Sequence, residues 1–250
     1  MVKFQVMSDL HIEYLEDGID PLSFIEPEVD ILILAGDIGR IYKYDQLYNF
    51  LKKLSENFIY IIYVLGNNEY YYSGDPEKKN MDELFQTAKK LETEIKNLHI
   101  LDRSCIIIND VCIIGCTLWS YTSEVPNFIV RIHEMNVCKY NKMHTEDLKY
   151  IKKMINYCKN KQLKCFVVTH HPPTFDVSFY KKKDNYRYKS LYGNNMDYLL
   201  SSEYVNTWLC GHVHVNFDYT TPGGTRLVSN QKGKVKDNIT DFSKNKIISL

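Results

Sequence analysis

The sequence lacks the features that usually identify secreted, membrane-embedded or strongly charged proteins. It contains no run of about eighteen apolar residues, so we predict no transmembrane helix. The N-terminus has none of the charged, apolar and small-residue sections of a signal peptide. Lysine plus arginine and aspartate plus glutamate each number 31, which gives a formal net charge of zero. This balance does not indicate binding to nucleic acid or to an anionic membrane, although a local basic patch is compatible with it. We therefore expect a cytoplasmic protein that does not act at a membrane, and the sequence does not indicate an oligomeric state.

The cysteines and the absence of a linker argue against a disulfide-bonded protein and against several domains. The seven cysteines are an odd number, and none form a CxxC pair. Cys112, Cys116, Cys165 and Cys210 lie in apolar runs, so we interpret them as reduced core residues rather than as disulfides or a thiolate metal site. No Pro-, Gly- or Ser-rich linker divides the 250 residues. We therefore predict a single domain spanning residues 1–250.

Two amphipathic segments predict helices that cover a parallel sheet. Residues 44–57 and 81–98 each repeat apolar side chains at helical spacing, with charged residues elsewhere. Such helices fit the crossovers between parallel strands of an α/β fold. Thr145, followed by two acidic residues, predicts the start of a third helix.

The remaining segments predict two hairpins and a weakly patterned tail. Residues 105–109 and 111–116 form short apolar runs separated by one aspartate. Residues 217–219 and 225–229 are joined through a Pro-Gly-Gly turn. The residues after 233 have no clear period, and we expect a surface strand or a tail there.

Five predicted strands end in residues that are able to bind metal ions. The most apolar run, residues 29–37, is too short for a typical helix and ends in Gly36-Asp37, which indicates a strand buried on both faces. The other strand ends supply Asp9 and His11 at the end of residues 4–10, Asn67 after 58–65, His170 after 165–169, and His212 and His214 after 207–210. Because open α/β sheets bind ligands at the carboxyl ends of their strands, we expect these side chains to converge.

Each of these motifs also has a purely structural interpretation when taken alone. An Asp-x-His pair such as Asp9-Leu10-His11 arises often by chance, and Asp37 could simply cap a turn. Asn67 lies in a Gly-Asn-Asn stretch that could be an ordinary turn, since asparagine tolerates left-handed φ. His212 and His214 are harder to explain in this way. Side chains at i and i+2 of a strand share one face, and two neighbouring imidazoles cost stability unless they stay unprotonated or bind a metal.

The metal-site interpretation therefore depends on the complete set. The seven residues offer carboxylate, amide and imidazole ligands without sulfur, which suits two borderline divalent ions such as manganese, iron or zinc. One carboxylate must then bridge the two ions. Asp37 is the natural bridge because the most buried strand holds it.

In order and spacing, the motifs resemble the calcineurin-like metallophosphoesterase superfamily. The matching motifs are Asp9-x-His11, Gly36-Asp37, Gly66-Asn67-x-Glu69, His170 in Thr-His-His-Pro-Pro, and Gly211-His212-x-His214. Further stretches resemble a small single-domain branch and extend the match to about residue 233: Thr117-Leu118-Trp119-Ser120, Met135-Asn136, Phe217-Asp218-Tyr219, Gly223-Gly224-Thr225-Arg226 and Asn230-x-Lys232-Gly233. The resemblance implies an α/β fold, a metallophosphoesterase-type β-sandwich of two mixed sheets flanked by helices.

The resemblance also implies how two divalent ions would be held. Asp9, His11 and His214 would bind one ion, Asn67, His170 and His212 would bind the other, and Asp37 would bridge them. Two cations about 3.5–4 Å apart clamp a phosphate and lower the pKa of a shared water toward about 7, which makes hydroxide available for attack on phosphorus.

One position departs from the family pattern. Members usually carry histidine after the metal-binding asparagine, where it protonates the leaving group, and this chain has Asn68. An amide donates a hydrogen bond but delivers no proton at neutral pH, and general acid catalysis contributes roughly 10²–10⁴ in rate. We hypothesise that the protein favours esters with acidic leaving groups, or that His171 or a tyrosine such as Tyr71 takes over the role.

Basic residues outside the motifs are candidates for substrate binding. Arg226 and Lys232 could reach a phosphate, and the alternative for each is a structural role in a turn. Residues 175–193 combine lysines, an arginine and tyrosines just after His170, so they could form a lid that grips phosphate and stacks on bases. A solvated loop is the alternative for this insert.

The sequence therefore predicts a metal-dependent phosphoesterase that acts on a phosphodiester or a nucleotide-like phosphate ester. A phosphomonoesterase, including a protein phosphatase, is the first alternative. The protein phosphatases carry a GDxxDRG pattern, whereas Gly36-Asp37 here continues as Ile38-Gly39-Arg40. A non-catalytic binding scaffold is the second alternative. Loss of ligands would favour it, and all seven are present.

Overall fold

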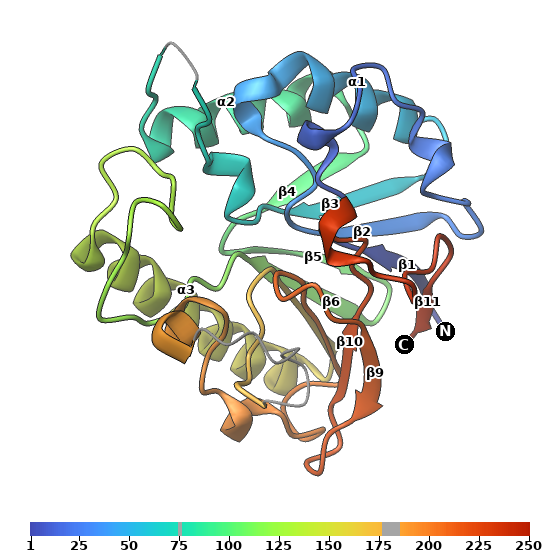
Figure 1. Cartoon of the computed structure of the whole chain (residues 1–250). Helices are drawn as coiled ribbons and strands as arrows, with labels where there is room; N and C mark the ends of the chain where they lie inside the picture. The colour runs from blue at the N-terminus through green and yellow to red at the C-terminus, as the bar shows by residue number, and fades with distance from the viewer. Residues whose placement is uncertain (75–76, 177–185) are drawn as a thin grey trace.

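Two β-sheets pack face to face, and helices cover their outer surfaces (Figure 1). The computed structural model describes residues 1–74, 77–176 and 186–250, and the elements given below belong to these residues. The first sheet has the strand order β11-β1-β2-β3-β4, and its strands are Ile247–Ser249, Lys3–Met7, Ile31–Ala35, Tyr60–Val64 and Leu98–Leu101. The second has the order β5-β6-β7-β8-β10-β9, and its strands are Ser104–Ile108, Val111–Cys116, Lys164–Thr169, Thr207–Leu209, Arg226–Ser229 and Phe217–Thr220. The predicted α/β sandwich of two mixed sheets is confirmed.

The first sheet carries the two predicted crossover helices. Strands β1 to β4 are parallel, and α1 (Tyr44–Leu54) and α2 (Met81–Glu94) cover the outer face. Leu51 of α1 and Leu91 of α2 are fully buried in one cluster with Leu34 of β2. Both helices end a few residues earlier than predicted, and the chain after α2 leads directly into β4.

Strand β2 is buried on both faces, as predicted. Its residues alternate between two clusters: Leu34 faces the helices, whereas Ile33 belongs to the layer between the sheets. This inner layer is apolar throughout, and the rings of Phe4 on β1 and Phe166 on β7 meet in it with centroids 5.3 Å apart. The carboxyl end of β2 is therefore anchored from both sides.

A single long helix, α3 (Val137–Lys161), covers the second sheet. It begins earlier than predicted, because Asn136 caps it by accepting a hydrogen bond from the Lys139 amide at 2.9 Å. Thr145 lies inside the helix and donates its hydroxyl to the Asn141 carbonyl. Few side chains of the first two turns are buried, so no apolar stripe marks them in the sequence. In the described parts of the chain, no helix combines the length and the apolar character needed to cross a membrane.

Both predicted hairpins are present, and the end of the chain joins the first sheet. Strands β5 and β6 pair antiparallel, as do β9 and β10. The tail supplies the short 3-10 helix η7 (Val235–Asp237) and then β11, which pairs antiparallel with β1 at one edge. Figure 1 accordingly shows the two chain ends side by side.

Candidate metal centre

The structure brings all seven predicted ligand residues together at the carboxyl ends of the inner strands. Asp9 and His11 follow β1, Asp37 follows β2, Asn67 follows β3, His170 follows β7, and His212 and His214 follow β8. Ligand atoms of six of them form two clusters, within each of which all atoms lie less than 4.8 Å apart. We call Asp9, His11 and His214 the first cluster, and Asp37, His170 and His212 the second cluster.

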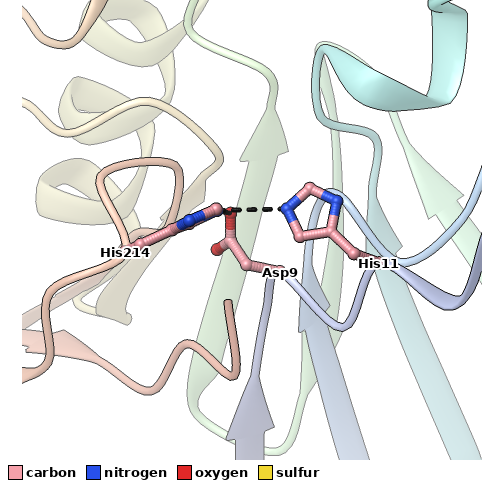
Figure 2. A group of neighbouring side chains, drawn as sticks. All are labelled: Asp9, His11 and His214. Carbon is pink, nitrogen blue, oxygen red and sulfur yellow. Dashed lines mark hydrogen bonds and ion pairs between the residues drawn. The ribbon is translucent and has the colours of Figure 1, made fainter. Parts of the chain in front are cut away.

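The first cluster is built from two segments that are more than two hundred residues apart in the sequence. Figure 2 shows Asp9 at the end of β1, with the His11 and His214 rings approaching its carboxylate from two sides. Nε2 of His214 lies 3.2 Å from Oδ1 of Asp9 and 3.1 Å from Nε2 of His11. Asp9 and His11 are buried, and His214 is half-buried at the rim.

The second cluster lies beside the first, and Asp37 faces both. Oδ1 of Asp37 is 3.3 Å from Nε2 of His170, whereas Oδ2 is 3.8 Å from Nε2 of His11 in the first cluster. Asn67 joins the second cluster, because its Oδ1 lies 3.0 Å from Nε2 of His170. These positions suit the predicted bridging role of Asp37.

Each of the four cluster histidines forms one hydrogen bond that points away from the cluster. Nδ1 of His11 donates to Glu13 (3.0 Å), and Nδ1 of His214 donates to Asp237 (2.5 Å). Nδ1 of His170 donates to the Ala35 carbonyl (2.9 Å), and Nε2 of His212 donates to the Leu191 carbonyl (3.2 Å). Carboxylates and carbonyls only accept, so these nitrogens carry the ring protons. When the rings are neutral, as metal ligands are, their remaining nitrogens present lone pairs to a metal, the usual arrangement of metal-binding histidines.

The donor set fits divalent cations. With both Nδ1 atoms protonated, the Nε2 atoms of His11 and His214 present lone pairs to each other across 3.1 Å. Nε2 of His170 likewise faces oxygens of Asp37 and Asn67. In neutral rings these facing acceptors repel, and either a proton or a metal cation between them removes the repulsion. Imidazole, carboxylate and amide groups without sulfur suit zinc, iron or manganese.

The electrostatics of the clusters agree with this arrangement. Burial alone would raise the pKa values of Asp9 and Asp37. The surrounding histidines lower these pKa values by more than burial raises them, so both lie below their usual range. Burial lowers the pKa of His170, yet Asp37 and the other carboxylates raise it to about 10. For His212, burial and the neighbouring histidines together lower the pKa. The clusters therefore combine anionic carboxylates with a strong attraction for positive charge.

Backbone strain is concentrated at the same residues. Positive φ values occur at Asp9 (53°), His11 (51°), Asp37 (55°), His212 (74°) and His214 (53°). Residues other than glycine rarely adopt this conformation, which costs of order 1–3 kcal/mol, and it gathers at functional sites. Packing of the two sheets therefore holds these side chains in positions that the local chain would not favour.

The comparisons with known proteins decide the family. The family model described as calcineurin-like phosphoesterase matches residues 2–216. The chain belongs to the calcineurin-like phosphoesterase family. Protein L509 of Acanthamoeba polyphaga mimivirus is 27% identical over 261 residues, covering 91% of this chain and 89% of that protein.

Solved structures share the fold of this calcineurin-like phosphoesterase at low sequence identity. Phosphopantetheinyl hydrolase (PptH) from Mycobacterium tuberculosis superposes with a TM-score of 0.78 at 15% identity, over 98% of this chain and 95% of that one. A dimetal phosphatase from Danio rerio has a TM-score of 0.52 at 13% identity, over 92% of this chain and 87% of that one. The first of these covers nearly the whole of both chains.

Glu69 of the phosphoesterase fixes the loop that carries Asp37. Its buried carboxylate accepts hydrogen bonds from the amides of Asp37 (3.0 Å), Ile38 (2.8 Å) and Gly66 (2.9 Å) and from the Tyr63 hydroxyl (2.5 Å). Burial and Asp37 raise the pKa of Glu69 to about 8, and the donors oppose that rise. A Cβ on Gly66 would lie 2.3 Å from Oδ1 of Asp37, so only glycine leaves room for the carboxylate there.

Sequence analysis missed the two carboxylates that orient the first-cluster histidines. Glu13 is buried and lies two residues after His11, so the spacing gave a weak local signal. Asp237 is in η7, within the tail that showed no clear pattern, and it reaches His214 across 23 residues. No local signal marks such a contact, because the fold alone creates it.

The predicted catalytic residues all lie beside the second cluster. Asn68 directs both its amide (2.8 Å) and its Nδ2 (2.6 Å) to the two oxygens of Asp37. The His171 ring lies 4.1 Å from that of His212, and burial and His170 lower the pKa of His171 to about 3. A cavity of about 20 Å³, enough for one water, is lined by both rings together with Tyr71. Burial raises the pKa of Tyr71, so its phenol keeps its proton.

The two predicted substrate-binding residues lie in different places. Arg226 begins β10, opposite the first residue of β8 and so at the far end of these strands from the clusters. Its guanidinium forms two hydrogen bonds with Asp218 (2.8 and 2.9 Å), an ion pair across the β9–β10 hairpin that fits the alternative of a structural role. Lys232 lies beside the first cluster, because its amide donates to the Ser8 carbonyl. Of the insert 175–193, residues 177–185 lie outside the described residues.

Proposed function

We propose that this protein is a two-metal hydrolase of phosphodiesters. The observation that carries the proposal is the outward hydrogen bond of each cluster histidine, which in the neutral ring leaves one lone pair directed toward Asp9 or Asp37. Family membership supports phosphoester hydrolysis in general. The name phosphopantetheinyl hydrolase, carried by the M. tuberculosis protein, favours a diester, and the name dimetal phosphatase, carried by the D. rerio protein, makes a monoester the alternative.

The residues divide the work in this proposal. Asp9, His11 and His214 would hold one ion, Asn67, His170 and His212 would hold the other, and Asp37 would be shared between them. Two such ions, when bound, activate a water and neutralise charge on the phosphoryl oxygens. Glu13 and Asp237 keep the histidine tautomers that leave Nε2 free. Glu69 holds the Asp37 loop, so that little reorganisation is needed when the phosphoryl group becomes more negative.

The leaving group has no strong acid in the described part of the chain. The Asn68 side chain donates its hydrogen bond to Asp37, and the low pKa of His171 leaves that ring neutral. Tyr71 offers a proton-bearing phenol that lines the same cavity. Substrates whose leaving groups depart without protonation should therefore react fastest.

The test is hydrolysis of bis(p-nitrophenyl) phosphate and p-nitrophenyl phosphate by metal-stripped protein titrated with manganese. The proposal predicts turnover that depends on manganese and is larger for the diester. Asp37→Asn is the control, because it removes the charge shared by both clusters, and it should show no turnover. Faster hydrolysis of the monoester would replace the diesterase assignment with a phosphatase. Binding of two ions without turnover of either ester would contradict hydrolysis and favour a scaffold.

A further inference from the structure

The loop after β10 places basic side chains beside the first cluster. The Lys232 amide donates to the Ser8 carbonyl (3.2 Å), and the Gly233 amide donates to the Asp9 carbonyl (2.9 Å). A few residues later, Asp237 holds the His214 ring. The loop is therefore tied at both ends to the residues of the first cluster, and its side chains have a fixed relation to any phosphate bound there.

Three cations lie over two aromatic rings, one of which is close to His11. Nζ of Lys234 and Cζ of Arg40 lie 5.5 and 5.3 Å from the centroid of the same ring, Tyr14. That ring is 6.0 Å from the ring of His11. Nζ of Lys232 lies 4.7 Å from the centroid of Phe24, and Lys232 is also within electrostatic range of Glu13. We call Arg40, Lys232 and Lys234 the cation triad.

The charges of the cation triad are not balanced by acidic groups. No carboxylate of residues 1–74, 77–176 or 186–250 lies within 4.0 Å of a charged nitrogen of these three side chains. The two acidic side chains nearby, Glu13 and Asp237, each hydrogen-bond a histidine instead. The charged nitrogens of the cation triad therefore lack direct ion pairs at this edge of the metal centre, and Glu13 attracts Lys232 only at longer range.

Arg40 shows that this lack of ion pairs is built into the fold. Its side chain is only 6% exposed, and Nε is buried without a hydrogen-bond partner, while Nη2 donates to the Tyr14 hydroxyl at 2.9 Å. Burying a cation without a carboxylate costs free energy, and a bound anion offsets that cost. Burial also lowers the pKa of Lys232, against the attraction of Glu13.

A groove of about 330 Å³ offers space for such an anion. Lys232 and Lys234 both line it, together with Gly233 and Asn238. The same segment contains η7, whose Asp237 orients His214. The groove therefore adjoins the first cluster, whereas the small cavity lined by Tyr71 and His171 adjoins the second.

We propose that the substrate carries a second anionic group, of the chemistry of a phosphate, and that Lys232 and Lys234 bind this group in the groove while the reacting phosphoryl lies at the metal centre; Arg40 adds positive charge behind Tyr14. The inference rests on the proposed function, and it narrows the substrate class to phosphate esters with an additional phosphate or similar anion. Lysine and arginine contacts to phosphate are charge-assisted and give both affinity and position.

Two matched substrates test the inference. We would compare thymidine 5′-(p-nitrophenyl phosphate) with the same compound phosphorylated at the 3′ hydroxyl, using manganese-loaded protein. The second phosphate should raise kcat/KM about tenfold in the wild type. In Lys232→Gln/Lys234→Gln this preference should fall to less than about twofold.

Two control variants sharpen the result. Lys142→Gln/Lys149→Gln removes the same charge from exposed positions of α3 and should keep the full preference. Lys232→Arg/Lys234→Arg keeps the charge of the triad and should keep most of it. A wild type that treats both substrates alike, or a preference that survives the glutamine variant, would overturn the inference.

A binding measurement separates this inference from the proposed function. Isothermal titration of the manganese-loaded protein with thymidine 3′,5′-bisphosphate and with thymidine 5′-monophosphate needs no turnover. Tighter binding of the bisphosphate that is lost in the glutamine variant would support the subsite even if hydrolysis were absent. Hydrolysis of both substrates with equal affinity for the two nucleotides would sustain the function and refute the subsite.

Discussion

The two clusters of the metal centre differ in what holds their histidines. In the first cluster, His11 and His214 donate to the side-chain carboxylates of Glu13 and Asp237. In the second, His170 and His212 donate to the backbone carbonyls of Ala35 and Leu191. Backbone acceptors are fixed by the fold, whereas carboxylate acceptors add negative charge and can be changed by one substitution. The first cluster should therefore be the one whose metal affinity is adjustable.

The two clusters also differ in the residues around them: the first has charged neighbours, and the second has mostly aromatic and apolar ones. The first lies at the rim, next to the cation triad and its groove. The second lies against His171 and Tyr71, around a cavity of about 20 Å³. We interpret the first cluster as the side where a charged part of the substrate is bound, and the second as the side with the more apolar wall.

The largest effect is expected where the clusters meet. Asp37→Asn removes the charge that faces His11 on one side and His170 on the other. Phosphodiester hydrolysis should fall by roughly 10³-fold or more, because both ions lose a ligand. Steady-state rates at saturating manganese measure this, with circular dichroism as the control for folding. A variant with near-normal rates would show that the clusters do not work together.

Substitution of the orienting carboxylates should affect one cluster alone. Glu13→Gln and Asp237→Asn keep side-chain size but remove the charge that fixes Nδ1 as the donor. Each should weaken metal binding at the first cluster by about 10–100-fold. Competitive titration of manganese against a fluorescent chelator should then show one weakened and one unchanged site. Equal weakening of both sites would contradict the separate roles assigned to the clusters.

Glu69→Gln tests the support of the second cluster through the loop of Asp37. The amide nitrogen of glutamine would face a donor, since all four groups bonded to Glu69 are donors. The free energy of unfolding should decrease by about 2–3 kcal/mol. Urea denaturation followed by circular dichroism measures this, and Glu56→Gln, at an exposed position just after α1, is the control. A loss well under 1 kcal/mol would show that this network is not needed for stability.

The smallest expected effect concerns the leaving group. Asn68→His restores a side chain that can hold a proton beside the second cluster. Rates on an alkyl phosphodiester should rise by about tenfold, and rates on an aryl phosphodiester should change little, because only the basic leaving group needs the proton. Comparison of methyl p-nitrophenyl phosphate with an alkyl diester measures the ratio. Equal changes on both esters would refute the hypothesis that Asn68 restricts the substrates.

The sequence predicted those parts of the structure that depend on local pattern. Buried strands that end in polar residues, such as β2 before Asp37, are visible as apolar runs, and their carboxyl ends had to meet once the strands were parallel. All seven predicted ligand residues accordingly lie together. The same reasoning misplaced the start of α3, because its first turns bury few side chains.

Contacts made only by the fold could not be predicted. Asp237 contacts His214 from a segment without periodicity, and Arg40 contacts Tyr14 across 26 residues. Arg226 looked suitable for phosphate, but the pairing of β9 with β10 places Asp218 against it. In each case the side chain that forms the contact lies at least eight residues away along the chain, and no local sequence pattern indicates the contact.

The most direct test of the central claim is the number of manganese ions held per chain. Equilibrium dialysis followed by elemental analysis should give two ions in the wild type. His214→Ala should retain one ion, held by the second cluster, and His212→Ala should retain one, held by the first. A wild type that holds fewer than two ions, or a pair of variants that each lose both or neither, would contradict the assignment of one ion to each cluster.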